Sequence, residues 1–319
     1  MNSASTNSIN GNTAIFGLLG SNVSQSHSMK MHNAAFLNQN RNACYIPLST
    51  TNEHFERAIN GCKSLDFCGL NVTIPYKEAI SSYVDFTTTL AHRLGSINTV
   101  KRSGDSYSGA NTDILGLWKS LQINNTQIAD RPAIIIGAGG AARAAVHLVY
   151  MANSNVTLEQ LVDQQLEELK HQQHFPSKQN KTNTTVSVAV INRSTERSNQ
   201  LAQNVQHSYG ASVEILSNPQ KIPTDAIVFQ CTPLGMQGHY PNVDPIESIK
   251  LSSQNSVVEL IATPAETPLI RRAQMTGSEV TFGKEMLLWQ AIYSQQIWGE
   301  MLPTEQLRQA MTDALANSL

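Results

Sequence analysis

Two charged residues, Lys77 and Asp113, stand in short segments that combine small polar groups with apolar runs. Lys77 ends the stretch 69–77, and Asp113 ends the sequence Gly-Ala-Asn-Thr-Asp about 35 residues later. Between them lies Gly-Ser-Ile-Asn-Thr-Val at 95–100. An ammonium and a carboxylate within hydrogen-bonding reach can share a proton and pass it to a substrate oxygen. The pattern therefore predicts acid–base chemistry on an oxygen-bearing substrate.

A dinucleotide-binding signature follows these segments. It has the form Gly137-x-Gly139-x-x-Ala142, comes directly after the apolar run Ala133–Ile136 and opens an alanine-rich stretch. A strand before the glycines and a helix after them is the context that the signature requires. Gly137 permits the tight turn, Gly139 lets the backbone approach a pyrophosphate, and the helix N-terminus offers free N–H groups. With the acid–base pair, this site predicts an enzyme that moves a hydride and a proton on a small polyol.

The strand after the glycine turn indicates which dinucleotide binds. An NAD enzyme usually carries Asp or Glu at the end of that strand, where the acid holds the ribose 2′-OH. Here the strand is followed by Asn-Arg-Ser-Thr-Glu-Arg at 192–197, in which Arg193 and Arg197 flank a pair of hydroxyls. Guanidinium groups bind phosphate well, so the pattern favours NADP. The alternative is a helix N-cap at Ser194 or Thr195 with solvated arginines.

Size, charge and cysteine use narrow the class of protein. The 319 residues are enough for about two domains, and the net charge of −2 gives no reason to expect nucleic acid or an anionic membrane as a partner. The sequence has no apolar run of the roughly 18 residues that a membrane-spanning helix needs. The four cysteines match no zinc spacing. We expect no metal, and reduced thiols in a cytoplasmic protein.

Apolar runs alternate with amphipathic stretches along the chain, which predicts an α/β protein with a mainly parallel sheet. The expected strands are Ala14–Gly20, Ala43–Pro47, Phe67–Ile74, Ala133–Ile136, Val186–Ile191, Ala226–Phe229 and Val257–Ile261. The expected helices include His32–Asn40, Phe55–Cys62 and Met286–Trp298. We expect the last of these helices to return to the first domain.

Two domains and two polar segments are expected. The first is a substrate-binding α/β domain at 14–114, completed by about 287–319, and the second is a Rossmann-like NADP-binding domain at 115–286. Residues 1–13 are rich in Asn, Ser and Thr and lack the features of a secretory signal, so we expect a disordered tail. A glutamine-rich insertion at about 153–185 has little apolar surface to bury, which predicts an exposed helix and a flexible loop.

Other polar residues are candidates for binding substrate. Ser26 and Ser28 lie two apart in a loop, where their hydroxyls could bind a carboxylate or one of them could cap the following helix. Gln290 stands between Trp289 and Ala291 on an apolar helix. A buried glutamine needs hydrogen-bond partners, and a substrate could supply them.

Each of the remaining candidates also has an ordinary structural interpretation. Lys77 alone would usually be a solvated lysine, and Asp113 alone could cap a helix that starts at Ile114. Taken singly, Asn71, Thr73 and Asn98 could each be an ordinary turn residue. These alternatives stay open for each residue in isolation.

Taken together and in this order, the motifs are similar to those of the shikimate dehydrogenase family over nearly the whole chain. The segments that carry the resemblance are Ser26-His27-Ser28, Asn71-Val-Thr-Ile-Pro-Tyr-Lys77, Asn98-Thr99, Asn111-Thr112-Asp113, the glycine turn at Gly137, Asn192-Arg193-Ser194, Thr232-Pro-Leu-Gly-Met236, and Met286-Leu-Leu with Gln290. Several unrelated motifs in family order make the resemblance specific.

The resemblance implies a role for each segment. Lys77 and Asp113 would form the catalytic pair, with Lys77 as general acid and base. The substrate carboxylate would be held by Ser26 and Ser28, and the ring hydroxyls by Asn71, Thr73, Asn98, Asp113 and Gln290. The pyrophosphate of NADP would lie on Gly137, Ala138, Gly139, Gly140 and Ala141, and its 2′-phosphate on Asn192, Arg193, Ser194, Thr195, Glu196 and Arg197. The residues near the nicotinamide would be Thr232, Leu260, Gly283 and Met286.

Several positions depart from the family pattern without touching the catalytic pair. In place of the usual His, Pro, Asp, Gly, Tyr and Gly, this chain has Gln25, Met29, Ala110, Ile114, Ala262 and Glu285. Glu259 also stands where the family has Asp. The change at Ala262 removes a hydroxyl near the substrate, so these departures bear on substrate preference and turnover.

The activity that the resemblance implies is the reversible reduction of 3-dehydroshikimate by NADPH to shikimate, a step towards chorismate and the aromatic amino acids. One alternative is a quinate or quinate/shikimate dehydrogenase, although Ser28, where Thr would favour quinate, favours shikimate. Another is a catalytically silent NADP-binding protein, against which the intact pair of Lys77 and Asp113 argues. We expect a small-molecule substrate as partner, with no nucleic acid and no membrane, and a homodimer stays open.

Overall fold

The computed structural model describes residues 9–175, 186–217, 219–238, 240–299 and 305–316. The chain divides into two compact units. Unit 1 comprises Met1–Thr112, Asp163–Phe175 and Gln290–Leu319, and unit 2 comprises Asp113–Val162 and Pro176–Trp289. Unit 1 contains both the N-terminal residues and Gln290–Leu319, which confirms that the C-terminal helices return to the first part of the chain.

Unit 1 is built on a mixed sheet. Its strands in the described residues are β1 (Ala14–Gly20), β2 (Ala43–Ser49), β3 (Gly69–Val72), β4 (Phe86–Thr87), β5 (Thr99–Ser103) and β6 (Ser106–Ala110), in the spatial order β2-β1-β3-β5-β6-β4. β1 pairs in parallel with β2 and β3, and β4 in parallel with β6. β5 is antiparallel to both of its neighbours, which fits the short turn between β5 and β6.

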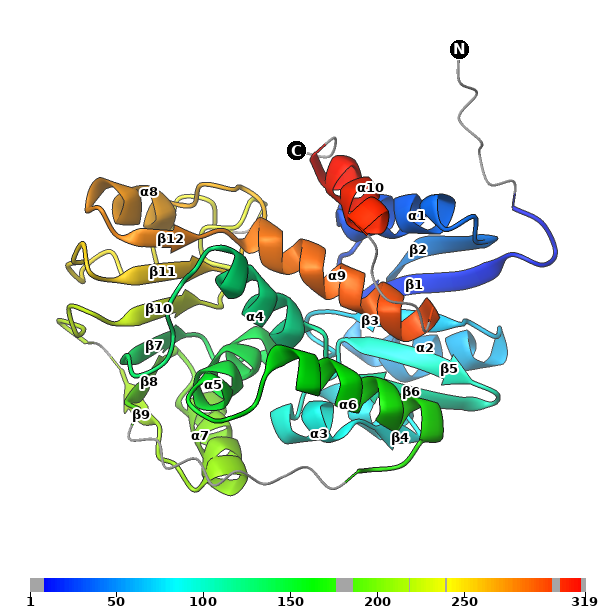
Figure 1. Ribbon diagram of the computed structural model, residues 1–319, viewed down its shortest axis with the longest axis horizontal. Coiled ribbons are helices and arrows are strands. Elements are labelled where there is room, and N and C mark those ends of the chain that lie inside the picture. Colours follow the sequence, from blue (N-terminus) through cyan, green and yellow to red (C-terminus); the bar gives the residue numbers. More distant parts are fainter. Residues whose placement is uncertain (1–8, 176–185, 218, 239, 300–304, 317–319) are drawn as a thin grey trace, which may run out of the picture. The chain divides into compact units, whose positions relative to one another are not determined.

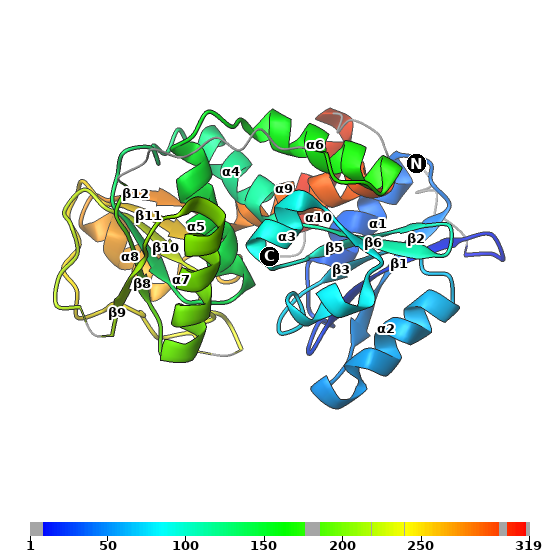
Figure 2. The same ribbon diagram turned by 90° about the horizontal axis from the view of Figure 1, so that it is seen from below.

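Alternation along β1 sets the two faces of this sheet. Phe16 and Leu18 enter a core with α1 (Ser28–Asn38) and α9 (Gly283–Gly299), whereas Ile15 and Leu19 enter a core with α2 (Phe55–Ser64). Successive side chains of a strand point to opposite faces, so one strand can supply both cores. Figures 1 and 2 show α1 and α2 on opposite faces of the sheet, with α10 (Glu305–Ala316) beside α1.

Unit 2 contains a parallel sheet of the doubly wound type. Its strands in the described residues are β7 (Ala133–Ile136), β8 (Val188–Ile191), β9 (Glu214–Leu216), β10 (Ile227–Gln230), β11 (Ser256–Glu259) and β12 (Glu279–Thr281), in the spatial order β12-β11-β10-β7-β8-β9. The order reverses at β7, which lies between β8 and β10. Ligands of such sheets bind beyond the carboxyl ends of the strands at this switch point. The predicted α/β class and the Rossmann-like order are thus confirmed.

Helices cover both faces of the unit 2 sheet. They are α4 (Asp113–Ile123), α5 (Gly140–Ala152), α7 (Thr195–Tyr209) and α8 (Pro268–Met275). α8 packs against Ile134, Val228 and Val257 on one face, and Figure 2 shows α5 and α7 on the other. No helix in the described ranges is both long and apolar enough to cross a bilayer.

The insertion differs from its prediction. Its helix, α6 (Leu158–His171), is not solvated on every side: Gln165 and Glu168 are 1% and 0% exposed, and Leu169 enters the same core as Phe16. The composition was misleading because the two buried polar side chains find hydrogen-bond partners, which removes the main cost of burying them. The predicted flexible loop at 177–185 lies outside the described residues.

The predicted N-terminal tail is described only from residue 9. Thr13 Oγ1 donates to Asn42 Oδ1 at 2.8 Å, and Asn42 Nδ2 donates to Asn10 Oδ1 at 3.2 Å. These bonds attach 9–13 to the turn before β2. Residues 1–8 lie outside the described part of the chain.

Candidate active site

Asn98 joins the segments that carry Lys77 and Asp113. Its backbone carbonyl accepts from the N–H of Val72, in the stretch that ends at Lys77, at 2.9 Å, and the N–H of the adjacent Ile97 donates to the carbonyl of Lys77 at 2.8 Å. The Asn98 side chain accepts from the backbone N–H of Thr112 at 2.7 Å and donates to Thr112 Oγ1 at 3.0 Å. Lys77 is half-buried in the turn after β3, and Asp113, directly after Thr112, is buried at the start of α4. Three segments that are distant in sequence are therefore tied together at one asparagine.

A buried polar network surrounds Asn98. The amide nitrogen of Asn71 contacts the Asn98 carbonyl at 3.1 Å and Ser294 Oγ at 2.9 Å. Asn71 Oδ1 accepts from the hydroxyl of Tyr45 at 2.8 Å, and Asn98 Nδ2 lies 3.5 Å from Gln290 Oε1. The structure therefore brings three predicted binding residues together. Fixed amides and hydroxyls of this kind suit a substrate with several hydroxyl groups.

Two members of this network were not expected from the sequence. Ser294 and Tyr45 are both buried, and each bonds the side chain of Asn71. One signal for Ser294 was present, because it follows Gln290 by four residues on a helix and therefore lies on the same face. Tyr45, in an apolar strand, carried no comparable signal.

Ser26 and Ser28 lie together at the beginning of α1. Ser26 Oγ donates to Ser28 Oγ at 3.1 Å and accepts from the Ser28 backbone N–H at 3.3 Å. His27 occupies the N-cap position of the helix and makes no side-chain cap bond. The two hydroxyls thus form a pair at a helix N-terminus, where the dipole favours an anion.

Thr73 follows β3 in a tightly packed loop. Its backbone N–H donates to the carbonyl of Leu19 at 2.9 Å. A Cβ added at Gly20 would come within 2.5 Å of Thr73 Cγ2, so the loop requires glycine at that position. This close approach packs the Thr73 side chain against the end of β1.

The glycine turn has the geometry that a pyrophosphate site needs. Gly137 has φ of +114°, and a Cβ there would lie 3.1 Å from Thr232 Cγ2, so this position requires glycine. A Cβ at Gly139 would meet no atom within 4 Å, so the space in front of it is open. α5 begins at Gly140 and presents its first N–H groups. The residues of the turn therefore fit a bound phosphate group.

The segment after β8 lies beside this turn, since the Gly137 N–H donates to the carbonyl of Ile191 at 2.8 Å. Ser194 caps α7, because its Oγ accepts from the backbone N–H of Arg197 at 3.3 Å. Arg193 and Arg197 are exposed. The capping role and the phosphate-binding role are compatible, because the cap uses the serine and leaves both guanidinium groups at the surface.

The remaining predicted cofactor residues gather at the same edge of the unit 2 sheet. Thr232 follows β10, and its backbone N–H and Oγ1 both donate to Gln230 Oε1 at 2.9 Å. A Cβ at Gly283 would lie 2.5 Å from the carbonyl oxygen of Ile261 and 2.7 Å from the carbonyl carbon of Leu260. Glycine is therefore needed where α9 begins, one turn before the buried Met286.

Glu259 is a buried carboxyl group at the end of β11. It is 1% exposed, and it accepts from the backbone N–H of Ile261 at 3.0 Å and from Thr267 Oγ1 at 2.8 Å. Loss of solvation raises its pKa to about 8, although these two hydrogen bonds act in the opposite direction. The group therefore titrates in the mildly alkaline range.

We expect Glu259→Gln to make the stability of the protein less sensitive to alkaline pH. The folded pKa is raised, so the stabilisation that is present below the unfolded value of 4.5 is lost as the pH rises towards 8. Between about pH 5 and pH 9, wild type should lose about 4 kcal/mol more unfolding free energy than the variant. Urea titrations at several pH values measure this difference, and parallel pH profiles would contradict the assignment.

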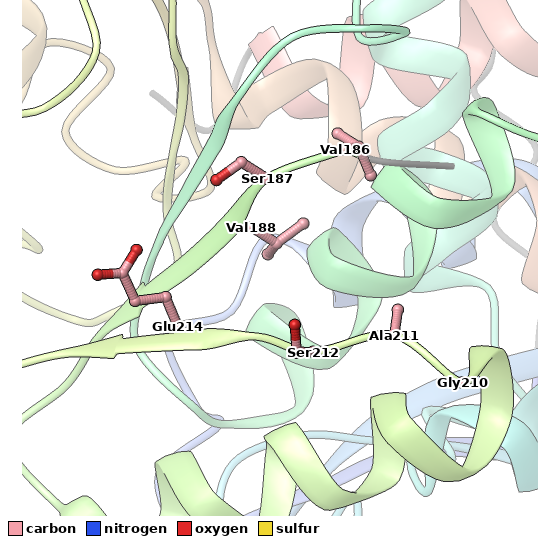
Figure 3. Close-up of a pocket in the computed structure, with 7 residues that line it drawn as sticks. All are labelled: Val186, Ser187, Val188, Gly210, Ala211, Ser212 and Glu214. Atoms are coloured by element: carbon pink, nitrogen blue, oxygen red, sulfur yellow. The ribbon is translucent and has the colours of Figure 1, made fainter. Parts of the chain in front are cut away.

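A cavity of about 460 Å³ lies elsewhere in unit 2 and is distinct from the glycine turn. Figure 3 shows its lining, which is formed by Val186, Ser187, Val188, Gly210, Ala211, Ser212 and Glu214. Val188 begins β8 opposite Ala133, the first residue of β7, whereas Gly137 follows the last. The cavity is thus at the amino-terminal edge of the strands, away from the edge where dinucleotides bind in this fold.

Known proteins are similar to this chain over nearly its full length. A family model described as the shikimate dehydrogenase substrate binding domain matches residues 18–100. Proteins named shikimate dehydrogenase (NADP(+)) from Symbiobacterium thermophilum and Methanobrevibacter smithii are 32% and 30% identical, covering 94% and 96% of this chain and 94% and 99% of their own. A crystal structure of shikimate dehydrogenase in complex with NADP+ is similar at 27% identity and a TM-score of 0.76, covering 96% of this chain and 97% of that chain.

Proposed function

Because the chain belongs to the shikimate dehydrogenase family, we propose that it catalyses the reversible reduction of 3-dehydroshikimate by NADPH to shikimate. The observation that carries the proposal is the convergence of the Lys77 and Asp113 segments on Asn98. This arrangement supports acid–base chemistry next to a surface of amides and hydroxyls. The glycine turn of unit 2 supports an NADP-dependent oxidoreductase of the shikimate pathway.

Lys77 transfers the proton to and from the substrate oxygen. In the reductive direction its ammonium group donates a proton to the ketone oxygen, and in the oxidative direction its amine accepts the proton of the hydroxyl. Asp113 orients the Lys77 side chain and accepts a hydrogen bond from a ring hydroxyl. NADP, when bound at the glycine turn, would supply or accept the hydride. Asn98 holds the Thr112 backbone and thereby fixes the position from which Asp113 acts.

Substrate binding is assigned to residues 14–114 and about 287–319. The paired hydroxyls of Ser26 and Ser28 hold the substrate carboxylate at the N-terminus of α1. The ring hydroxyls bond to the polar side chains of Asn71, Thr73, Asn98, Asp113 and Gln290. Hydrogen-bonding groups that are already ordered before binding raise affinity, because less entropy is lost on association.

NADP binding is assigned to residues 115–286. The backbone from Gly137 to Ala141 holds the pyrophosphate, and the segment 192–197 holds the 2′-phosphate, with both arginines at the surface beside the turn. The residues that would border the nicotinamide are Thr232, Leu260, Gly283 and Met286. Hydrogen bonds from a guanidinium group to a phosphate are among the stronger ones in proteins.

Replacing Arg193 and Arg197 together by Ala should weaken the preference for NADP+. We expect kcat/KM for NADP+ to fall at least about 100-fold, because each of the two charge-assisted hydrogen bonds contributes about 1.5–3 kcal/mol, while kcat/KM for NAD+ changes little. Initial rates with both cofactors measure the ratio. Arg271→Ala, at another exposed arginine of unit 2, serves as control. An equal loss with both cofactors would contradict the assignment.

Oxidation of shikimate by NADP+ with the purified protein tests the proposed activity. Quinate is the second substrate to compare, because Ala262 and the other departures from the family pattern bear on substrate preference. Faster turnover of shikimate than of quinate is expected. The opposite order would assign the chain to the quinate branch.

A cytoplasmic location and a homodimer are also part of the proposal. The cysteines in the described residues are free thiols, which fits a reducing compartment. Light scattering on the purified protein should return about twice the chain mass of 34.9 kDa. A mass of one chain would remove the homodimer from the proposal.

A further inference from the structure

Two polar side chains are buried in the part of the insertion helix α6 that belongs to unit 1. Gln165 and Glu168 are three residues apart on one face of the helix and are 1% and 0% exposed. Leu166 and Leu169 of the same helix pack in the core that contains Phe16. Burying an amide and a carboxylate costs free energy unless both groups find hydrogen-bond partners, so the partners of these two side chains matter.

Gln165 bonds the backbone of Asn111 at both of its polar groups. Its Nε2 donates to the Asn111 carbonyl at 3.0 Å, and its Oε1 accepts from the Asn111 N–H at 3.0 Å. The same Oε1 accepts from Thr88 Oγ1 at 3.0 Å. The pairing of β4 with β6 ends at Thr87 and Gly109. The side-chain amide of Gln165 therefore bonds the backbone N–H and carbonyl of Asn111, two residues beyond the end of this pairing.

Glu168 fixes the neighbouring segment. Its two carboxylate oxygens accept from the backbone N–H of Thr89 at 2.7 Å and from Thr89 Oγ1 at 2.6 Å. Thr89 begins α3 (Thr89–Leu94), which leads into Ser96 and Asn98. The Asn111 side chain in turn donates to the carbonyl of Ser96 at 2.8 Å. One helix thus holds the beginning of α3 and the end of β6, the two elements that lead into Asn98 and Asp113.

We propose that Gln165 is a positioning residue for Asp113, so that the insertion is part of what orders the active site. This inference rests on the proposed function. Asn111 is two residues before Asp113, and the intervening Thr112 is fixed by Asn98. Without Gln165, the first residue of the segment loses its side-chain anchor, and the carboxylate of Asp113 moves away from the position that orients Lys77. A misplacement of about 1 Å can lower a rate about 100-fold.

The test compares Gln165→Met, which keeps the shape and removes all three hydrogen bonds, with Leu169→Ala, which weakens the packing of the same helix. For Gln165→Met we expect kcat for shikimate oxidation to fall about 10- to 100-fold, with KM for NADP+ unchanged within about twofold. Leu169→Ala should lower the melting temperature at least as much and keep kcat within about twofold of wild type. Equal effects of both variants on kcat would overturn the proposal, because they would show a merely structural role. Gln165→Asn, a milder change with a shorter amide, should lower kcat in the same direction.

Hydrogen–deuterium exchange on the enzyme without substrate gives a readout that does not depend on turnover. Backbone amides of residues 111–113 should exchange about tenfold faster or more in Gln165→Met, because the Asn111 N–H loses its acceptor. They should exchange at the wild-type rate in Leu169→Ala. Unchanged exchange in Gln165→Met would overturn the positioning role. If wild type failed to oxidise shikimate, the proposed function would fall, and the exchange result would still decide whether Gln165 anchors this segment.

Discussion

Lys77→Met should lower kcat for shikimate oxidation by about 100- to 10,000-fold, which is the contribution that a positioned acid or base makes to proton transfer. Methionine keeps the length of the side chain and removes the amine. Lys77 is half-buried in a turn, so the unfolding free energy should change by less than about 1 kcal/mol. Steady-state rates with NADP+ and a thermal unfolding curve measure both quantities.

Lys250→Met is the matched control for this substitution, because Lys250 is an exposed lysine of unit 2. It should keep wild-type kcat. In Lys77→Met, KM for NADP+ should stay within about twofold, because the substitution leaves the glycine turn untouched. Wild-type kcat in Lys77→Met would remove Lys77 from the mechanism and leave the two binding assignments standing.

His32→Phe should make the protein less sensitive to acid. His32 is fully buried, its ring stacks on that of Tyr45 at 4.3 Å between centroids, and its Nδ1 accepts from Gln295 Nε2 at 2.8 Å. Loss of solvation lowers its pKa from 6.5 to about 3. The folded protein therefore holds a neutral imidazole where the unfolded chain would take up a proton.

The sign of the effect follows from this difference in proton binding. The stabilisation from neutral His32 is fully present above the unfolded pKa of 6.5 and is lost as the pH falls towards 3. Between about pH 7.5 and pH 4, wild type should lose about 3 kcal/mol more unfolding free energy than His32→Phe. Urea titrations across this range give the slope. Phenylalanine also removes the acceptor of Gln295, so only the difference in slope, and not the absolute stability, reports on the imidazole. Equal slopes would contradict the lowered pKa.

The strands that the sequence predicted are those with short apolar runs. Ala14–Gly20 and Ala133–Ile136 have the predicted bounds as β1 and β7. β5 and β6 were missed because they are rich in Ser, Thr, Lys and Arg. The dipeptide Gly104-Asp105 was a local signal for a hairpin turn. In the structure these two residues form the turn between the paired Ser103 and Ser106, with φ of +60° at the glycine.

The site was predictable where a motif carries its own chemistry and not where side chains meet only in space. Lys77, Asp113 and the glycine turn could be named as candidates from residue type and order. The bonds of Asn98 to Thr112 join residues 14 apart, and those of Gln165 to Asn111 join residues 54 apart. Polar residues in a glutamine-rich helix usually face water, so composition alone could not separate Gln165 from its exposed neighbours.

The most direct measurement is the oxidation of shikimate by the purified full chain with NADP+, with reduced cofactor and product quantified together. The proposed mechanism predicts one 3-dehydroshikimate for each NADPH formed, faster turnover with shikimate than with quinate, and faster turnover with NADP+ than with NAD+. It also predicts that Lys77→Met loses this activity while remaining folded. Folded wild-type protein that binds NADP+ and turns over neither substrate would contradict the proposed activity.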